Sequence, residues 1–251
     1  MLPKITIVTV VYNAGDVIRG CIESVLAQDY ENYEYVIIDG GSTDSTLAVI
    51  NEYRDRISVI VSEKDRGMYD ALNKGLSYVN GELWASLNAD DRYSSGTVLS
   101  EVAKIYDEDF SCSIYYGDLN IISSNGERYR RTIDANIKDI VSYGQCSIVT
   151  QPASFINCKL NKDVSFDTQY QCASDYDYIV KCALNGPCKR LKICITDFYR
   201  HEGSITEKYK SIMKRETDDI AVYYAAQLNL IKLFSIIRKG CLALKRGVVN
   251  L

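Results

Sequence analysis

The first ninety residues alternate between short apolar runs and longer stretches that carry apolar side chains at helical spacing. The short runs are rich in β-branched and aromatic residues and are bounded by turn formers, so they predict buried strands. The four predicted strands are residues 4–13, 33–39, 57–63 and 82–87. The three predicted helices between them are residues 16–28, 42–56 and 69–79. This alternation predicts βαβ units and an α/β fold with a mostly parallel central sheet.

After residue 97 the strands and helices no longer alternate regularly. Residues 113–122 and 127–133 are strand-like and are joined by Ser-Asn-Gly, which is typical of an antiparallel hairpin. The other predicted elements are helices at 97–108 and 174–186 and strands at 152–160 and 190–206. The second half of the chain is therefore expected to extend the sheet in a different way.

Polar or acidic side chains follow each of the four strands predicted in the first half. In chain order they are Tyr12, Asp39, Asp65, Asp90 and Asp91. In an open parallel sheet the ligand binds at the carboxyl ends of the strands, where all these side chains are expected to meet. The pattern therefore predicts one ligand site at this edge.

The carboxylates of Asp90 and Asp91 are adjacent in the sequence and follow an apolar strand. Two such carboxylates repel each other unless a positive charge lies between them, and carboxylate oxygens are preferred ligands of Mg²⁺ and Mn²⁺. The alternative is a solvated turn in which an Asp caps the next helix. The chain contains neither G-x-G-x-x-G nor G-x-x-x-x-G-K-[ST], so a bound nucleoside diphosphate would need a metal to meet its charge.

Four stretches occur together and in order: "TIVTVVYN", "YEYVIIDGGSTDST", "EKDRGMYDALNKG" and "NADD". With these motifs the chain resembles the family 2 glycosyltransferases, which have the GT-A fold, use nucleotide sugars and invert the anomeric centre. The third stretch is similar to a form found in enzymes that build bacterial surface polysaccharides. The resemblance covers roughly residues 4–206.

The resemblance implies roles for residues that match the family motifs. It implies that Thr9 and Tyr12 flank the base and ribose of the nucleotide, and that Asp39 accepts a hydrogen bond from the base. It further implies that Asp65, Asn73 and Lys74 lie near the base and sugar. Asp90 and Asp91 would bring in Mn²⁺ or Mg²⁺ against the diphosphate, with Asp90 also contacting the donor.

Two of these assignments have plain structural alternatives. Asp39 and Ser42 also fit a tight turn followed by a helix cap. Asn73 and Lys74 also fit an exposed helix face.

An inverting transfer needs a base that removes the proton of the attacking hydroxyl. In the family this is an Asp that opens a helix, and "CASDYDY" assigns it to Asp175, with Asp177 as the rival. Ser174 stands where the commonest family form has Glu, and the alternative reading of the stretch is a helix N-cap.

His201 is the only histidine in the chain. Some related enzymes complete the metal or diphosphate site with a late histidine or a basic residue, so the resemblance implies that role for His201. Arg200 is an alternative phosphate contact. The alternative is that His201 binds neither a metal nor a phosphate.

Composition and targeting signals bear on the partners and the cellular location of the protein. The 251 residues carry a net charge of −4, which gives no sign of a nucleic-acid partner. The nine cysteines form no C-x-x-C pair, which together with one histidine makes a zinc site improbable. A secretory signal pattern and a transmembrane run are both lacking, so we expect a cytoplasmic protein.

The C-terminal segment differs from the rest in charge. From Ile220 onward it has five basic residues and no acidic one. We expect a catalytic domain at 1–206, with a nucleotide-sugar half at 1–96 and an acceptor half at 97–206, and a basic amphipathic helical extension at 207–251. The extension either docks on an anionic membrane at the inner face of the cell membrane or packs on protein.

Together these features predict a metal-dependent inverting glycosyltransferase that moves a sugar from a nucleoside-diphosphate sugar, with UDP favoured, to a glycan or lipid-linked glycan. One rival is a nucleotide-sugar-binding protein of the same fold without catalysis. A second is a sugar nucleotidyltransferase, but that class needs a glycine-rich basic first loop, and "VVYNAGDV" has one glycine and no basic residue.

Overall fold

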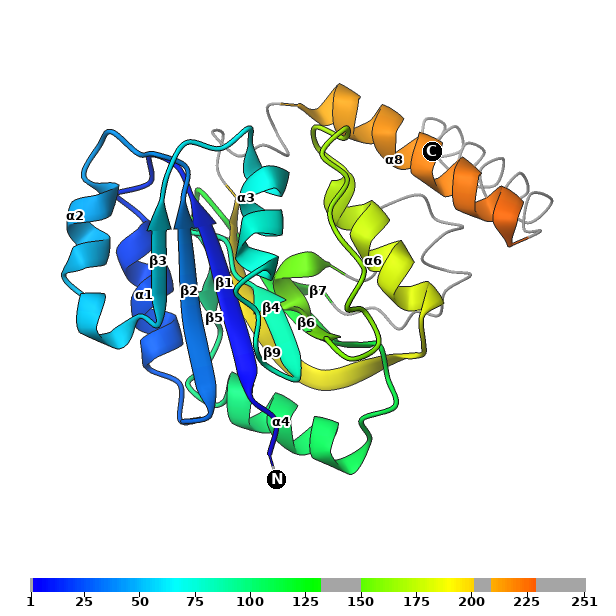
Figure 1. The fold of residues 1–251 in the computed structure, drawn as a ribbon, viewed down its shortest axis with the longest axis horizontal. Coiled ribbons are helices and arrows are strands. Elements are labelled where there is room, and N and C mark those ends of the chain that lie inside the picture. The colour runs from blue at the N-terminus through cyan, green and yellow to red at the C-terminus, as the bar shows by residue number, and fades with distance from the viewer. Residues whose placement is uncertain (1, 132–149, 201–208, 229–251) are drawn as a thin grey trace, which may run out of the picture.

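The computed structural model describes residues 2–131, 150–200 and 209–228 (Figure 1). The first half forms the predicted parallel sheet, in the order β3-β2-β1-β4. Its strands are β1 (Ile5–Val11), β2 (Tyr33–Asp39), β3 (Val59–Ser62) and β4 (Leu83–Ser86). Its helices are α1 (Ile18–Leu26), α2 (Thr46–Asn51) and α3 (Met68–Leu76), and a 3-10 turn η1 (Arg54–Arg56) follows α2. The strand–helix alternation predicted for this half is confirmed.

The second half continues the same sheet with antiparallel and parallel pairings, in the order β4-β8-β6-β9-β5, with β7 beside β6. Its strands are β5 (Arg92–Tyr93), β6 (Ile114–Ser123), β7 (Arg128–Arg131), β8 (Ser154–Asn157) and β9 (Cys188–Arg200). The predicted hairpin is confirmed as β6 and β7, with Gly126 at a φ of +83° in the turn. The short strand β5 was not among the predicted strands, and it exists because Arg92 and Tyr93 pair with the distant strand β9.

Helices cover both faces of the sheet. One core contains buried residues of α1, α2 and α4 (Val98–Glu108), and the other contains residues of α3, α6 (Ser174–Leu184) and α8 (Lys210–Gln227). A 3-10 turn, η2 (Gln151–Ala153), leads into β8. Figure 1 shows α3 in front of the sheet and α8 running past α6. All residues of β1 are buried, whereas β3 is only partly buried because it is the outermost strand of this side of the sheet.

An aromatic cluster joins the two halves below the carboxyl edge. The rings of Phe166 and Tyr178 stack with centroids 4.2 Å apart, and Trp84 meets both edge-on. The Trp84 indole N–H donates to the Tyr178 hydroxyl over 3.2 Å, and Tyr69 stacks on the other side of Phe166 at 6.0 Å. The cluster thus fastens β4, α3 and α6 to one another.

The expected C-terminal helix begins in the described part of the chain. Four residues of α8 belong to the same core as α6: Ile220, Ala221, Tyr224 and Ala225. The five basic residues of the expected amphipathic segment lie outside the described residues. Within the described ranges, no helix is long and apolar enough to cross a membrane.

We predict that Phe166→Ala destabilises the fold by about 3–5 kcal/mol, because the change removes a buried ring from between two others. Urea denaturation measures the free energy of unfolding. The matched control is Phe110→Ala, since the Phe110 side chain is 68% exposed and its loss should change stability by less than about 0.5 kcal/mol. Equal unfolding midpoints for the two variants would contradict the role given to the cluster.

Candidate active site

The loops after β1 and β2 are tied together at the carboxyl edge. The Asn13 backbone N–H donates to the Ser42 hydroxyl over 2.8 Å, and the Thr43 N–H donates to the Asn13 side-chain oxygen over 2.9 Å. Asn13 has a φ of +49°, a left-handed conformation that Asn tolerates better than most residues. Tyr12 comes just before it and is 63% exposed, so its ring is open to a ligand at this edge.

The carboxylate of Asp39 is buried and organises the turn that follows β2. It accepts hydrogen bonds from the backbone N–H groups of Gly41 and Ser42 and from the Ser62 hydroxyl, the last at 2.7 Å. The turn-forming role considered as an alternative is therefore present. A carboxylate has about four acceptor directions, so these three donors leave room for one more.

Asp65 brings the loop after β3 against the loop after β2. One of its oxygens accepts from the Gly67 N–H over 2.8 Å, and the other lies 2.4 Å from the position that a Cβ on Gly40 would take. A Cβ at position 40 would push the Asp65 carboxylate aside, so glycine there suits this close approach. Asp39 and Asp65 consequently lie in adjoining loops, as the strand pattern predicted.

Asn73 and Lys74 both hold neighbouring segments. The Asn73 side chain makes two hydrogen bonds to the backbone of Phe166, each of 2.9 Å. The Lys74 ammonium pairs with Glu63 over 2.9 Å and donates to the Lys64 carbonyl over 3.2 Å. These side chains are thus engaged in the protein, which differs from the solvated helix face considered for them.

Thr9 lies away from the carboxyl-edge side chains. It is fully buried, and its hydroxyl is 3.0 Å from the Tyr35 hydroxyl and 3.6 Å from the Cys21 sulfur. Successive side chains of a strand point to opposite faces, and Thr9 falls on the face that α1 covers. The resemblance placed Thr9 beside the nucleotide, but its hydroxyl faces the core, so we leave it out of the site.

Asp90 and Asp91 differ sharply in environment. Asp91 is fully buried, and it accepts hydrogen bonds from the Asn88 amide over 2.8 Å and from the Tyr199 backbone N–H over 3.1 Å. Burial and the neighbouring Asp90 charge raise the pKa of Asp91 well above its usual range. Asp90 is partly exposed, so it faces any ligand at this edge. Sequence reasoning did not identify Tyr199, whose contact with Asp91 spans 108 residues.

The chemistry of this pair fits a divalent cation. Adjacent carboxylates offer hard oxygen ligands, and a cation would offset the burial and the Asp90 charge that together raise the Asp91 pKa. In the described part of the chain, no three His, Cys, Asp or Glu side chains gather into a metal site. A cation held here would therefore depend on donor phosphate or water for most of its ligands. His201 lies outside the described residues.

Asp175 lies in the first turn of α6, half-buried, where the Tyr69 hydroxyl of α3 donates to its carboxylate over 3.3 Å. Desolvation raises the pKa of Asp175 to about 6, although the Tyr176 backbone N–H and the Tyr69 hydroxyl oppose the shift. The contact joins the helix that follows Asp65 to the helix that carries Asp175.

The carboxylate of Asp177, the alternative candidate for the base, is bound by other side chains of the protein. It is buried, accepts a hydrogen bond from the Tyr224 hydroxyl over 2.9 Å, and pairs with the Lys181 ammonium over 2.6 Å. Two residues along a helix turn the side chain by about 200°, so Asp177 faces α8 when Asp175 faces α3. This geometry favours Asp175 as the reactive carboxylate.

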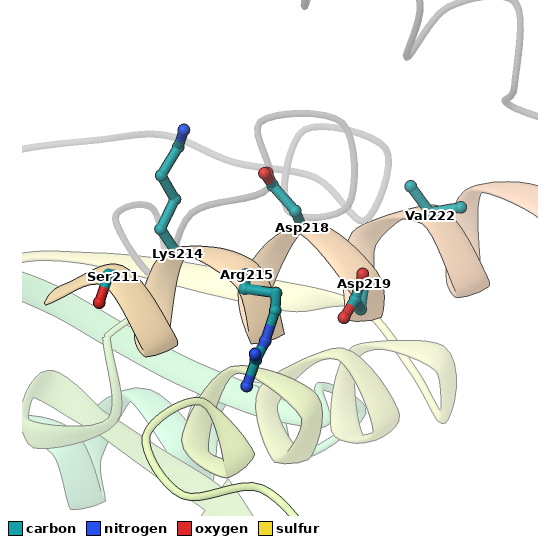
Figure 2. Close-up of a pocket in the computed structure, with 6 residues that line it drawn as sticks. All are labelled: Ser211, Lys214, Arg215, Asp218, Asp219 and Val222. Atoms are coloured by element: carbon teal, nitrogen blue, oxygen red, sulfur yellow. The ribbon is translucent and has the colours of Figure 1, made fainter. Parts of the chain in front are cut away.

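A separate shallow hollow lies on the surface of α8. Its lining residues are Ser211, Lys214, Arg215, Asp218, Asp219 and Val222, all from that helix (Figure 2). It contains none of the candidate site residues, and its mixed charges select no ligand. We do not assign the donor to it.

Comparison with known proteins identifies the family. A model described as Glycosyl transferase family 2 matches residues 6–165, more than half of the chain. A PGL/p-HBAD biosynthesis glycosyltransferase of Mycobacterium tuberculosis is 27% identical over 186 residues, which cover 73% of this chain and 71% of that protein. An uncharacterized glycosyltransferase of Rickettsia felis is 34% identical over 130 residues, 51% of this chain and 21% of that protein.

Solved structures share the fold at low sequence identity. S. aureus TarS 1–349 in complex with UDP-GlcNAc is 19% identical with a TM-score of 0.69, over 87% of this chain and 70% of that one. The mannosyltransferase PcManGT from Pyrobaculum calidifontis, in complex with GDP-Man and Mn²⁺, is 16% identical with a TM-score of 0.60, over 97% of this chain and 81% of that one. The chain has the GT-A fold, belongs to glycosyl transferase family 2, and is a glycosyltransferase.

Proposed function

We propose that this glycosyltransferase is metal-dependent and inverting, and that it moves a sugar from a nucleoside-diphosphate sugar to a glycan acceptor. The observation that carries the proposal is the contact between Tyr69 and Asp175. It brings a half-buried carboxylate of the second half beside the helix that follows the acidic loops of the first half. A donor at the strand ends and a base beside it are the two parts that an inverting transfer needs.

The donor nucleotide would lie over the loops after β1, β2 and β3. Tyr12 supplies an exposed ring for the base, Asp39 has an acceptor direction left for a base N–H, and Asp65 lies next to Asp39 across Gly40. UDP is our first choice because TarS was solved with UDP-GlcNAc. Asn73 and Lys74 would act indirectly, by holding the segments around the sugar.

Asp90 would bind the cation directly. The buried Asp91 would add negative charge behind Asp90, and its hydrogen bonds to Asn88 and Tyr199 hold the loop in place. When bound, Mn²⁺ or Mg²⁺ neutralises the charge that develops on the leaving diphosphate. The Mn²⁺ in the PcManGT structure supports this choice of ions. His201 is retained as a further candidate ligand, on the resemblance alone.

Asp175 would accept the proton of the acceptor hydroxyl as that oxygen attacks the anomeric carbon on the face opposite the diphosphate. One displacement inverts the configuration, and the proton ends on the Asp175 carboxylate. A base works best when its pKa is near the working pH, and the raised pKa of Asp175 suits this role. A non-catalytic binding protein would have no need of such a carboxylate, which argues against that rival.

The acceptor is proposed to be a lipid-linked glycan met at the inner face of the cell membrane. The name of the mycobacterial relatives refers to PGL/p-HBAD biosynthesis, and the chain's own support is the basic C-terminal segment. A sugar nucleotidyltransferase remains disfavoured, because the loop after β1 lacks glycine-rich and basic character.

Replacing Asp175 by Asn should lower transfer by about 10²-fold or more, because Asn keeps the shape but not the basicity. The measurement is the initial rate of UDP release from a UDP-sugar, chosen by thermal shift from a panel with Mn²⁺. The wild-type rate should fall about tenfold per pH unit below about 6, as Asp175 becomes protonated, and level off above it. The matched control is Asp219→Asn on the exposed side of α8, and full activity of Asp175→Asn would reject the assignment.

Changing Asp90 and Asp91 together to Asn should abolish metal-dependent nucleotide binding, because the carboxylate that would bind the ion and the buried carboxylate behind it are both lost. Titration calorimetry with UDP, in Mn²⁺ and in EDTA, measures the effect. Far-UV circular dichroism checks that the variant folds. The metal proposal fails if UDP binds wild type equally well in both buffers.

Neutralising the five basic residues of the C-terminal segment should weaken binding to anionic vesicles, since each basic side chain near such a surface contributes about 1 kcal/mol. The residues, each changed to Gln, are Lys232, Arg238, Lys239, Lys245 and Arg246. Co-sedimentation with phosphatidylserine vesicles at low and high salt is the measurement, and wild-type binding should fade as salt rises. Equal binding by both proteins, or none by wild type at low salt, would show that the segment packs on protein instead.

A further inference from the structure

Residues 166–173 lead directly into α6, and we call them the approach segment. Their first residue is held by α3, where the Asn73 side chain bonds both the N–H and the carbonyl of Phe166. The Phe166 ring is also stacked between Tyr69 and Tyr178. Asp175 follows two residues after the end of this segment, so the path of the segment determines where its carboxylate lies.

The other end of the approach segment is held by α8. The two carboxylate oxygens of Glu216 accept separate hydrogen bonds, from the Gln171 N–H over 3.0 Å and from the Cys172 N–H over 2.8 Å. Glu216 is only 9% exposed, and Cys172 is 6% exposed. Hydrogen bonds to an ionised acceptor are stronger than neutral ones, and burial makes their loss more costly.

Helix α8 also packs against α6, through residues that follow Glu216 along the helix. Ile220, Ala221 and Tyr224 pack in the same core as α6, and the Tyr224 hydroxyl donates to Asp177 over 2.9 Å. Glu216 and Tyr224 lie eight residues apart, which is about 12 Å along a helix. The two contacts therefore hold α8 along the approach segment and the first turns of α6, and not at a single point.

The chemistry of Glu216 suits two N–H groups that point the same way. A carboxylate accepts from both, whereas Gln accepts from one and turns an NH₂ group toward the other, and Ala leaves both without that partner. A carboxylate is therefore the side chain that matches these two backbone N–H groups. In the proposed transfer, Glu216 has no direct chemical role.

We infer that Glu216 is a positioning residue for the transfer reaction: it holds the approach segment so that the Asp175 carboxylate meets the acceptor hydroxyl. The inference rests on the proposed function, in which Asp175 is the base. It gives helix α8 a part in positioning the base, although Glu216 lies 41 residues after Asp175 and bonds only the approach segment in the described part of the chain.

The pH dependence of the reaction rate can distinguish a positioning role of Glu216 from a role in the stability of the fold. In the described part of the chain, the Tyr69 hydroxyl of α3 bonds Asp175 and the Cys172 thiol of the approach segment lies within reach of its charge, whereas Asp177 on the same helix points toward α8. If the segment loosens, water reaches Asp175 and the desolvation that raises its pKa is reduced. The acid limb of the rate profile should then move to lower pH, which a loss of folded protein alone would not cause.

The test uses the full chain with Mn²⁺ and the UDP-sugar found by thermal shift, and it compares Glu216→Ala and Glu216→Gln with wild type. We expect kcat for UDP release to fall about 10- to 100-fold in Glu216→Ala and less in Glu216→Gln, with KM for the donor within about twofold. The acid limb should move to lower pH in both. Asp219→Asn removes the same charge from the exposed side of the same helix, and its kcat should match wild type.

A double variant distinguishes this inference from the proposed function. When Asp175 is already Asn, adding Glu216→Ala should lower the rate little further, because the positioned group is gone. The inference is overturned if Glu216→Gln, folded by thermal melting, keeps wild-type kcat and pH profile, or if Glu216→Ala acts equally with and without Asp175. If Asp175→Asn alone is fully active, the proposed base is wrong, and the inference falls with it.

Discussion

The buried carboxylate of Asp91 is the interaction on which the arrangement of this site depends. A charge taken out of water must be matched by hydrogen bonds, and Asp91 finds one at the end of its own loop, from Asn88, and one from the backbone of Tyr199 in β9. The second bond crosses from the parallel half of the sheet to its last strand. Asp90 is the more exposed of the two, so a single burial requirement determines which of the two acidic neighbours is accessible at this edge.

The same principle recurs around the site. Asp39 is buried and organises a turn, Asp177 is buried and binds α8, and Glu216 is buried and holds the approach segment. Each of these carboxylates is matched by donors, so each defines the path of a neighbouring segment. Asp175 differs because it is half-buried with a raised pKa, and the donors that oppose the shift do not cancel it. A carboxylate that is poorly compensated is well suited to take up a proton.

The aromatic cluster gives these polar contacts a rigid base. Phe166 lies between Tyr69 and Tyr178, so α3 and α6 are joined through one ring of the segment that leads to Asp175. Packing of this kind restricts motion in all directions, whereas a hydrogen bond restricts mainly one distance. The two together explain how a residue far along the chain can be held beside the loops of the first half.

The sequence by itself determined the alternation of strands and helices, the hairpin of β6 and β7, and the gathering of Asp39, Asp65 and Asp90 at one edge of the sheet. These features follow from local periodicity and from the geometry of parallel strands, which a linear pattern records. Tertiary structure alone decided that Thr9 faces the core, that Arg92 and Tyr93 form a strand, and that Asp177 bonds Tyr224 of α8. It also decided that Asn73 holds Phe166 and that Glu216 reaches back to Cys172, because these contacts join residues 93 and 44 positions apart and have no local signal.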